Sequence, residues 1–199
     1  MQKSVVARRG RPGYDAESLL TAAVAVFTER GYDGTTMDDL AVALGISKSS
    51  IYHHVSGKKE LLSRALDRAL DSLETALRVA ADDGIDPVSR LAAAVQSSVR
   101  VLVTELPFVT LLLRVRGNTD VERSALLRRR KIDAEFAGMV AAAQQAAEIR
   151  TDVDPQLVAR LVFGTVNSLI EWYRPRRGIS AEQLVDAVCA MVFDGLRVR

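Results

Sequence analysis

Hydrogen-bonding side chains cluster in the short segment from residue 46 to residue 54. Ile46 and Ile51 supply an apolar side that can pack against a neighbouring helix. The opposite side carries small, polar and basic residues, namely Lys48, Ser49, Ser50, Tyr52 and His53. Small serine side chains let a helix approach base edges closely, while lysine and tyrosine can donate to phosphate oxygens. The chemistry available here is hydrogen bonding to a nucleic acid.

Two short helices separated by a sharp turn must hold that segment in place. Thr35 or Thr36 begins the first helix, because each has an aspartate three residues further on, as in a capping box. Gly45 supplies the turn at a positive φ, and Ser47 caps the second helix. This arrangement predicts a helix-turn-helix whose second helix lies in the major groove of DNA.

Lys58 begins the next predicted helix and would sit beside the DNA backbone with the amides of that helix N-terminus. The predicted DNA contacts are therefore Thr36, Ser47, Lys48, Ser49, Ser50, Tyr52, His53 and Lys58. Ordinary helix surface is the alternative for each of them taken alone. A metal site at His53 and His54 is disfavoured, because adjacent helical residues point about 100° apart and the sequence has only 2 histidines.

The overall composition suits a globular protein, with 48% hydrophobic and 26% charged residues in 199. The net charge of +2 means that DNA binding must come from local charge. Residues 1–13 are locally basic and predict a flexible arm that reaches phosphates or a minor groove, or else a solvated terminus; its cations are Lys3, Arg8, Arg9 and Arg11. The single cysteine allows no intrachain disulfide, and no segment resembles a signal peptide or membrane span. We expect a cytoplasmic protein.

Helical periodicity extends over nearly the whole chain and predicts an all-α fold of about nine helices. The expected helices run from about 15 to 31, 35 or 36 to 44, 47 to 54, from 58, 87 to 106, 108 to 115, 120 to 148, 155 to 173, and from 180. We expect a helix-turn-helix domain at 14–57 and a C-terminal helical bundle at 58–199. The helix from residue 58 is long enough to link the two.

Several short motifs carry a family resemblance: GYDGTTM at 31–37, LA at 40–41, LGIS at 44–47, IYHH at 51–54, Lys58 and Leu61. Together they resemble the N-terminal signature of TetR-family transcriptional regulators over about residues 15 to 62. Val55 departs from the usual phenylalanine, which is a change of packing. The resemblance implies a three-helix DNA-binding domain followed by a helical domain for ligand binding and dimerisation. It also implies that the last two long helices pair with those of a second copy.

The last two predicted helices are apolar on more than one face, so each has two surfaces to pack against. Their apolar residues include Leu157, Leu161, Val162, Val166, Leu169, Ile170, Leu184, Val185, Val188, Met191, Val192 and Phe193. A second copy or a larger monomeric core would satisfy both faces. We favour a homodimer, because two recognition helices about one DNA turn apart require it.

The C-terminal half also offers candidate ligand contacts. Such residues are also what any helical core contains, but an apolar pocket is predicted from Leu102, Leu106, Phe108, Leu112, Val115, Phe136, Met139 and Phe163. Trp172, Tyr173, Arg174 and Pro175, followed by Arg176 and Arg177, resemble the same region of TetR-like repressors that sense acyl-coenzyme A thioesters. An adenine would stack on Trp172, and phosphates would bind Arg174, Arg176 or Arg177. A core tryptophan beside solvated arginines is the alternative.

The sequence therefore predicts a ligand-responsive regulator, most simply a repressor. It would bind a palindromic double-stranded DNA operator as a homodimer, and a small-molecule inducer, with an acyl-coenzyme A as one candidate, would release it. An enzyme with a DNA-binding head is a second possibility. No nucleophile motif, phosphate-binding glycine loop or metal ligand set is recognisable, and a pair of catalytic carboxylates is the chemistry left open. An architectural DNA-binding protein without a ligand is a third, and the low net charge disfavours it.

Overall fold

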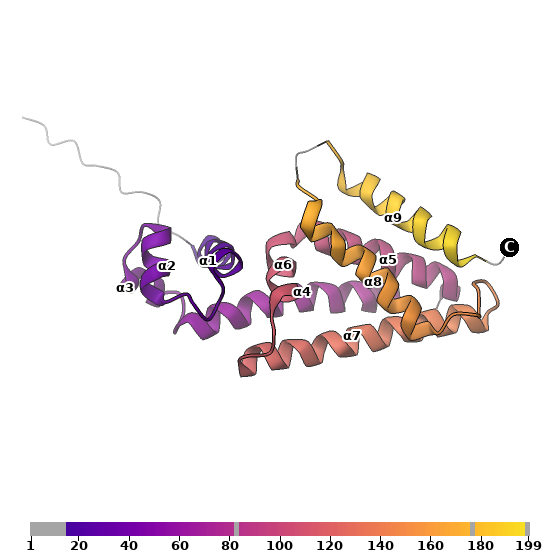
Figure 1. The fold of residues 1–199 in the computed structure, drawn as a ribbon, viewed down its shortest axis with the longest axis horizontal. Helices are drawn as coiled ribbons and strands as arrows, with labels where there is room; N and C mark the ends of the chain where they lie inside the picture. Colours follow the sequence, from indigo (N-terminus) through magenta and orange to yellow (C-terminus); the bar gives the residue numbers. More distant parts are fainter. Residues whose placement is uncertain (1–14, 82–83, 176–177, 198–199) are drawn as a thin grey trace, which may run out of the picture.

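The computed structural model describes residues 15–81, 84–175 and 178–197. Within these ranges the chain forms nine α-helices and no strand, which confirms the all-α prediction (Figure 1). The helices are α1 (Ala16–Arg30), α2 (Met37–Leu44), α3 (Lys48–Tyr52), α4 (Lys58–Ala80), α5 (Pro87–Thr104), α6 (Leu106–Arg114), α7 (Asp120–Gln145), α8 (Pro155–Trp172) and α9 (Ala181–Leu196). The predicted basic arm at 1–13 and the arginines at 176 and 177 lie outside the described residues.

The first three helices form a small unit, which we call the head. Asp15 caps α1 by accepting a hydrogen bond of 2.7 Å from the backbone of Ser18, as its sequence predicts. The head is held by fully buried apolar residues from all three helices, among them Leu19, Leu40 and Ile51. Because α3 is only five residues long, its angle depends on this packing and not on its own helix propensity.

Helix α4 leaves the head and continues along α5–α9, which we call the body (Figure 1). Its apolar side is buried from Leu61 to Leu77 except at Leu73, which is half-buried. That side packs against α1 in the head and against α5, α6 and α7 in the body. One rigid element is therefore shared by both parts of the molecule.

The corner between α5 and α6 comes earlier in the chain than the helix bounds predicted from the sequence. Helix α5 ends at Thr104, and Pro107 occupies the second position of α6. Proline is tolerated there, because the first turn of a helix leaves its backbone N–H groups unpaired. The two helices meet at 98°. Among the described residues, no single helix is long and apolar enough to span a membrane, and this bent pair is the only combination with that length and hydropathy.

The other boundary difference lies at the end of α7. This helix stops at Gln145 instead of near Glu148, because Ala147 adopts a φ of +57°. Such a left-handed residue interrupts the helix.

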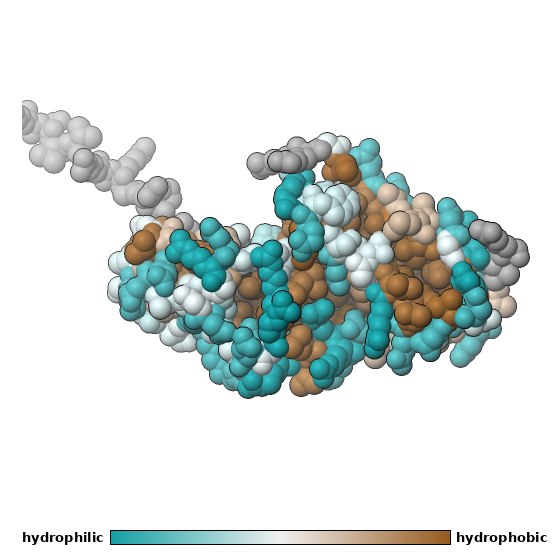
Figure 2. All heavy atoms as spheres, in the orientation of Figure 1, coloured by the Kyte–Doolittle hydropathy of each residue, from teal (hydrophilic) through white to brown (hydrophobic). Residues whose placement is uncertain are grey.

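One face of α8 and α9 exposes large apolar side chains. Leu157 and Leu161 on α8 are 49% and 60% exposed, and Met191 on α9 is 60% exposed. Figure 2 shows hydrophobic residues gathered over the part of the surface where α8 lies. The opposite sides of both helices are buried, so each helix has the two apolar faces predicted from its sequence.

Candidate DNA-binding surface and ligand pocket

Helix α3 presents its polar side to solvent. Lys48, Ser49 and His53 are exposed, and the tyrosine side chain of Tyr52 is 48% exposed. Ile51 is fully buried on the opposite side, which fixes the rotation of the helix. The Ser47 hydroxyl caps α3 by accepting from the backbone of Ser50 at 3.1 Å. This orientation exposes four of the predicted DNA contacts to solvent.

The turn that leads into α3 is built as its sequence predicts. The Thr36 hydroxyl accepts from the backbone N–H of Asp39 at 3.1 Å, and the Asp39 carboxylate accepts from the backbone N–H of Thr36 at 2.8 Å. Gly45 ends α2 in the left-handed region, with φ +65° and ψ 32°. An L side chain is disfavoured in that conformation, so glycine is required for the turn.

Both lysines among the predicted DNA contacts have partners within the protein. The Lys48 ammonium lies 2.9 Å from a carboxylate oxygen of Asp38, and that hydrogen bond raises the pKa of Lys48. The Lys58 ammonium donates to the backbone oxygen of Tyr32 at 2.8 Å and lies 4.2 Å from the centre of its ring. Lys58 therefore holds the loop between α1 and α2.

No metal site accompanies the two histidines. Within 15–81, 84–175 and 178–197, no group of three or more histidine, cysteine, aspartate or glutamate side chains could hold a metal ion. His53 is exposed and His54 is half-buried, so the neighbouring residues present different sides of the chain.

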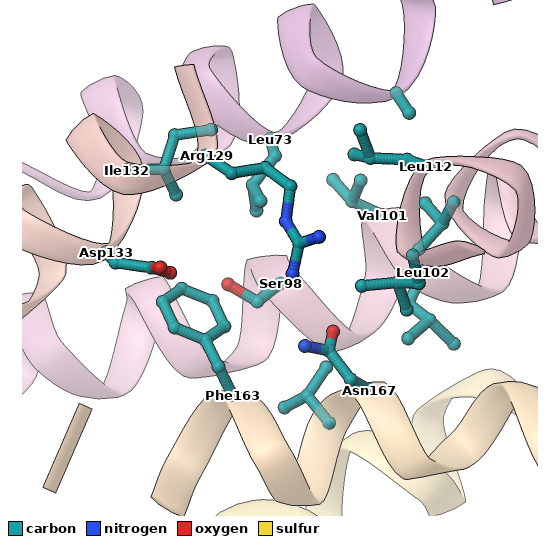
Figure 3. Close-up of a pocket in the computed structure, with 14 residues that line it drawn as sticks. Leu73, Ser98, Val101, Leu102, Leu112, Arg129, Ile132, Asp133, Phe163 and Asn167 are labelled. Atoms are coloured by element: carbon teal, nitrogen blue, oxygen red, sulfur yellow. The ribbon is translucent and has the colours of Figure 1, made fainter. Parts of the chain in front are cut away.

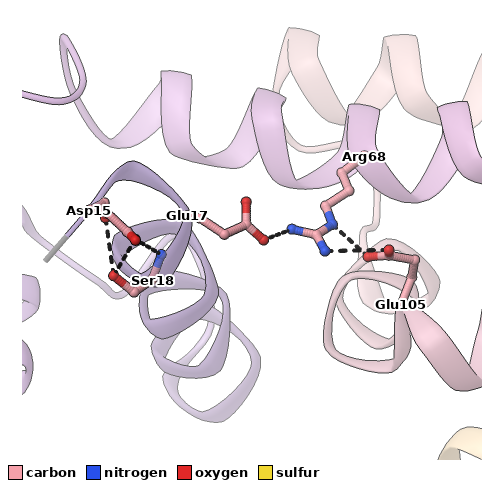
Figure 4. A network of polar contacts seen from close by, with 5 residues as sticks. All are labelled: Asp15, Glu17, Ser18, Arg68 and Glu105. Carbon is pink, nitrogen blue, oxygen red and sulfur yellow. Dashed lines mark hydrogen bonds and ion pairs between the residues drawn. The ribbon is translucent and has the colours of Figure 1, made fainter.

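One arginine and two carboxylates form an ion-pair cluster that joins the head to the body (Figure 4). Arg68 on α4 forms ion pairs with Glu17 on α1 and with Glu105 at the corner between α5 and α6. The guanidinium carbon also lies 4.1 Å from the centre of the Phe108 ring on α6. The hydrogen bond to Glu105, more than any other contact, raises the pKa of Arg68. One side chain thus links three helices.

Further polar contacts join α1, the loop after it and the start of α4 to the end of α6, the loop after it and α7. Arg114 donates to the backbone oxygen of Thr28 at 2.9 Å, and Asn118 donates to Asp33 at 2.8 Å. Lys59 pairs with Asp120 at 2.7 Å. Sequence reasoning missed all of these contacts, because the partners lie 86, 85 and 61 residues apart and no local pattern connects them.

A cavity of about 50 Å³ lies inside the body, between α4, α5, α6, α7 and α8 (Figure 3). Three predicted pocket residues, Leu102, Leu112 and Phe163, line it. The Phe136 ring lies against that of Phe163, with ring centres 4.7 Å apart. The rest of the lining is mostly aliphatic but includes four polar residues that were not predicted as pocket residues: Ser98, Arg129, Asp133 and Asn167.

The other predicted ligand contacts lie away from this cavity. Leu106 is half-buried at the start of α6, and Phe108 packs against Arg68 instead. Trp172 is 53% exposed at the end of α8, so it is not a core anchor. The Arg174 guanidinium donates to the backbone oxygens of the last turn of α8, those of Ile170, Glu171 and Tyr173. Arg174 therefore caps the C-terminus of that helix.

Two adjacent arginines on α7, Arg128 and Arg129, have different surroundings. Arg128 is committed to structure, because it forms ion pairs with Asp67, Asp71 and Glu74 on α4 at 2.9, 2.5 and 2.9 Å. These carboxylates raise its pKa further above the ordinary value, chiefly through the hydrogen bonds to Glu74. Arg129, by contrast, turns toward the cavity.

An exposed recognition helix on a helical body that encloses a pocket defines a DNA-binding transcriptional regulator of the helix-turn-helix class. The family model for bacterial regulatory proteins of the tetR family matches residues 19–65, and the model for the tetracyclin repressor-like C-terminal domain matches residues 84–196. The chain belongs to the TetR family.

Similar proteins cover almost the whole chain. The crystal structure of SCO3833, a TetR-family member from Streptomyces coelicolor A3, is 52% identical, with a TM-score of 0.82 over 90% of this chain and 91% of that one. The transcriptional repressor KstR2 of Rhodococcus jostii is 29% identical over 94% of this chain and 93% of its own length. The structure of AibR in complex with isovaleryl coenzyme A and operator DNA is 27% identical, with a TM-score of 0.72 over 89% and 97%. These relatives are regulators of transcription, which is not an enzymatic activity.

Proposed function

We propose that this protein represses transcription by binding a palindromic operator as a homodimer, and that a small-molecule inducer releases it. The observation that carries this proposal is the solvent-exposed polar side of α3 above the fully buried Ile51. In this assignment residues 14–57 bind DNA, and residues 58–199 bind the inducer and the second copy. The protein acts by binding and not by catalysis, in the cytoplasm where the chromosome lies.

The exposed apolar residues of α8 and α9 support the dimer. Leu157, Leu161 and Met191 lie on the same side of the molecule and line, or adjoin, a shallow groove between the two helices. Large apolar side chains with this exposure are typical of an interaction surface. A two-fold axis through this face would present both heads to one side of a duplex.

The inducer would act through α6. Val109 and Leu112 of this helix line the cavity, and Arg114 at its end contacts the backbone of α1. The cavity of about 50 Å³ is far below the roughly 300 Å³ of a typical ligand site. An inducer must therefore move its walls apart, and displacement of α6 would change the position of the head. The inducer can shift the equilibrium between the DNA-binding and the released conformation only by the difference in its affinity for the two.

An acyl-coenzyme A is one candidate inducer. The similar protein AibR was crystallised with isovaleryl coenzyme A, and the exposed ring of Trp172 is available for stacking. Arg174 is less available for the phosphates, because its guanidinium is occupied by backbone oxygens. Isothermal titration of isovaleryl coenzyme A against the protein and its Trp172→Ala variant tests this assignment. If the adenine stacks on Trp172, the variant should bind the thioester more weakly.

DNA binding is tested with duplexes that the full-length protein selects from a random pool. Lys48→Ala should weaken binding and lower the salt slope by about one, because one phosphate contact is lost. Tyr52→Phe should weaken binding about fivefold through the loss of one hydrogen bond. Lys131→Ala, an exposed lysine on α7 far from the head, is the matched control.

The outcomes separate the parts of the proposal. Unchanged affinity in both head variants would refute the assignment of α3. Selected sequences without two half-sites about one DNA turn apart, or a monomer in sedimentation at binding concentrations, would refute the dimer. Steep salt dependence without sequence selection would instead indicate the architectural alternative.

A further inference from the structure

Arg129 brings a positive charge to a mostly apolar cavity. Its guanidinium makes no hydrogen bond or ion pair with another residue in the described part of the chain, whereas its neighbour Arg128 is surrounded by three carboxylates. Figure 3 shows the Arg129 side chain extending over Leu73 toward Ser98 and Asn167. Arg129 interacts electrostatically with the Asp133 carboxylate, four residues further along α7, but the two side chains are too far apart for an ion pair. A half-buried cation that makes no hydrogen bond has lost part of its hydration and gains more than an exposed one from binding an anion.

The groups around this guanidinium complete a polar end of the cavity. The Ser98 hydroxyl is buried and donates to the backbone oxygen of Ala94 at 2.8 Å, so its own oxygen can still accept. Asn167 is half-buried, and its side-chain amide has no hydrogen-bond partner among the described residues. The Asp133 carboxylate lies beside the Phe163 ring in Figure 3. Burial raises the pKa of Asp133, and the positive charges of Arg129 and Arg160 partly oppose that rise.

The remaining walls are aliphatic and belong largely to α5 and α6. Leu102 comes from α5, and Val109, Leu112 and Leu113 come from α6. A molecule with its charge at Arg129 would extend an apolar chain among these residues. Each added methylene of that chain would gain about 0.8 kcal/mol from burial while pressing on α6.

We propose that this cavity binds an amphipathic anion, with its negative group on the guanidinium of Arg129 and its apolar chain against α6. The inference rests on the proposed function, because it names the chemical class of the inducer. The negative group is either the carboxylate of a free acid or a phosphate of a coenzyme thioester, and both offer oxygens that match the guanidinium fork.

The test measures binding to the full-length protein without DNA, by isothermal titration. The probes are straight-chain acids from butanoate to decanoate, together with octanamide and octylamine, which keep the chain of octanoate but lose or invert its charge. Octanoate should bind at least tenfold more tightly than octanamide, and octylamine should bind most weakly. Arg129→Gln should weaken octanoate binding by roughly 10- to 100-fold and leave octanamide binding unchanged.

Two variants control the experiment. Arg130→Gln changes the next residue of α7, which is exposed and does not line the cavity, and should leave all affinities unchanged. Arg129→Lys keeps the charge without the planar fork and should fall between the native protein and Arg129→Gln. The thermal unfolding of each variant without added ligand establishes that it is folded.

Octanoyl coenzyme A distinguishes the two sources of charge. If the free acid binds more tightly, the carboxylate is the recognised group; if the thioester binds more tightly and Arg129→Gln abolishes the difference, a phosphate is recognised. The proposal is overturned if no acid or thioester binds, if octanamide binds as well as octanoate, or if Arg129→Gln leaves the preference for charge intact. Because no DNA is present, these results are independent of whether α3 binds an operator.

Discussion

Replacing Arg68 should lower the stability of the protein more than replacing any other residue of α4 that forms an ion pair. The comparison leaves out the three carboxylates of α4 that pair with Arg128. Arg68 donates to both oxygens of Glu105, at 2.5 Å from Nε and 3.3 Å from Nη2. The two side chains are only 32% and 18% exposed. In Arg68→Gln, the Glu105 carboxylate would remain largely buried without its counter-ion.

The magnitude follows from these contacts. A charge-assisted hydrogen-bonded pair contributes about 1.5–3 kcal/mol, and partial exposure places this pair at the lower end. The contact with the Phe108 ring adds about 0.5–1 kcal/mol. The Glu17 contact adds less than about 1 kcal/mol, because Glu17 is 63% exposed. The free energy of unfolding should therefore fall by about 2–3 kcal/mol, which corresponds to about 5–10 °C in Tm for a chain of this size.

Urea unfolding at one fixed protomer concentration measures this change, since dimerisation would make stability depend on concentration. Lys59→Gln is the matched control, because Lys59 also lies on α4 and pairs with Asp120, but both partners are more than 60% exposed. It should cost less than about 1 kcal/mol. A double-mutant cycle of Arg68→Gln with Glu105→Gln should give a coupling energy of about 1.5–2 kcal/mol. The reasoning would be refuted if Arg68→Gln and Lys59→Gln lowered the free energy of unfolding equally, or if the coupling energy between Arg68 and Glu105 were near zero.

Two further predictions concern the head. Hydrogen bonds from the Thr36 side chain, and then from its backbone, lower the pKa of Asp39, so the stability that Asp39 contributes is present above about pH 4 and is lost as the pH falls through its folded-state pKa. Asp39→Asn should thus lower the Tm at pH 7 but leave it close to native near pH 2, and a constant difference at both pH values would contradict this. Asp38→Asn should strengthen DNA binding in mobility shifts at low salt, because it frees Lys48 and removes a negative charge beside the duplex; weaker binding would show that Asp38 instead positions Lys48 on the DNA.

Local signals predicted most of the fold. Thr36 and Ser47 cap helices as predicted, because a cap involves only residues two or three positions away. The same local contact occurs in four further helices, which are capped by Asp15, Asp86, Asp154 and Ser180. The position of the corner before Pro107 and the end of α7 depend on packing and were predicted only approximately.

The pocket was the least predictable part of the molecule. Leu112 and Phe163 line the cavity while Phe108 does not, although all three are buried apolar residues and look equivalent in sequence. The distinction depends on how five helices pack together, which no window of sequence contains. The same is true of Arg128 and Arg129, which are adjacent arginines with different surroundings.

The continuous α4 has a consequence for protein engineering. A chimaera that combines the operator preference of one relative with the inducer of another would have to be spliced inside this helix, since no flexible linker separates the two parts. Such a hybrid inherits Glu17 from one parent and Glu105 from the other, with Arg68 assigned by the choice of junction. Whether the inducer still releases the chimaera from its operator should depend on whether the residues at these three positions can form the same ion pairs.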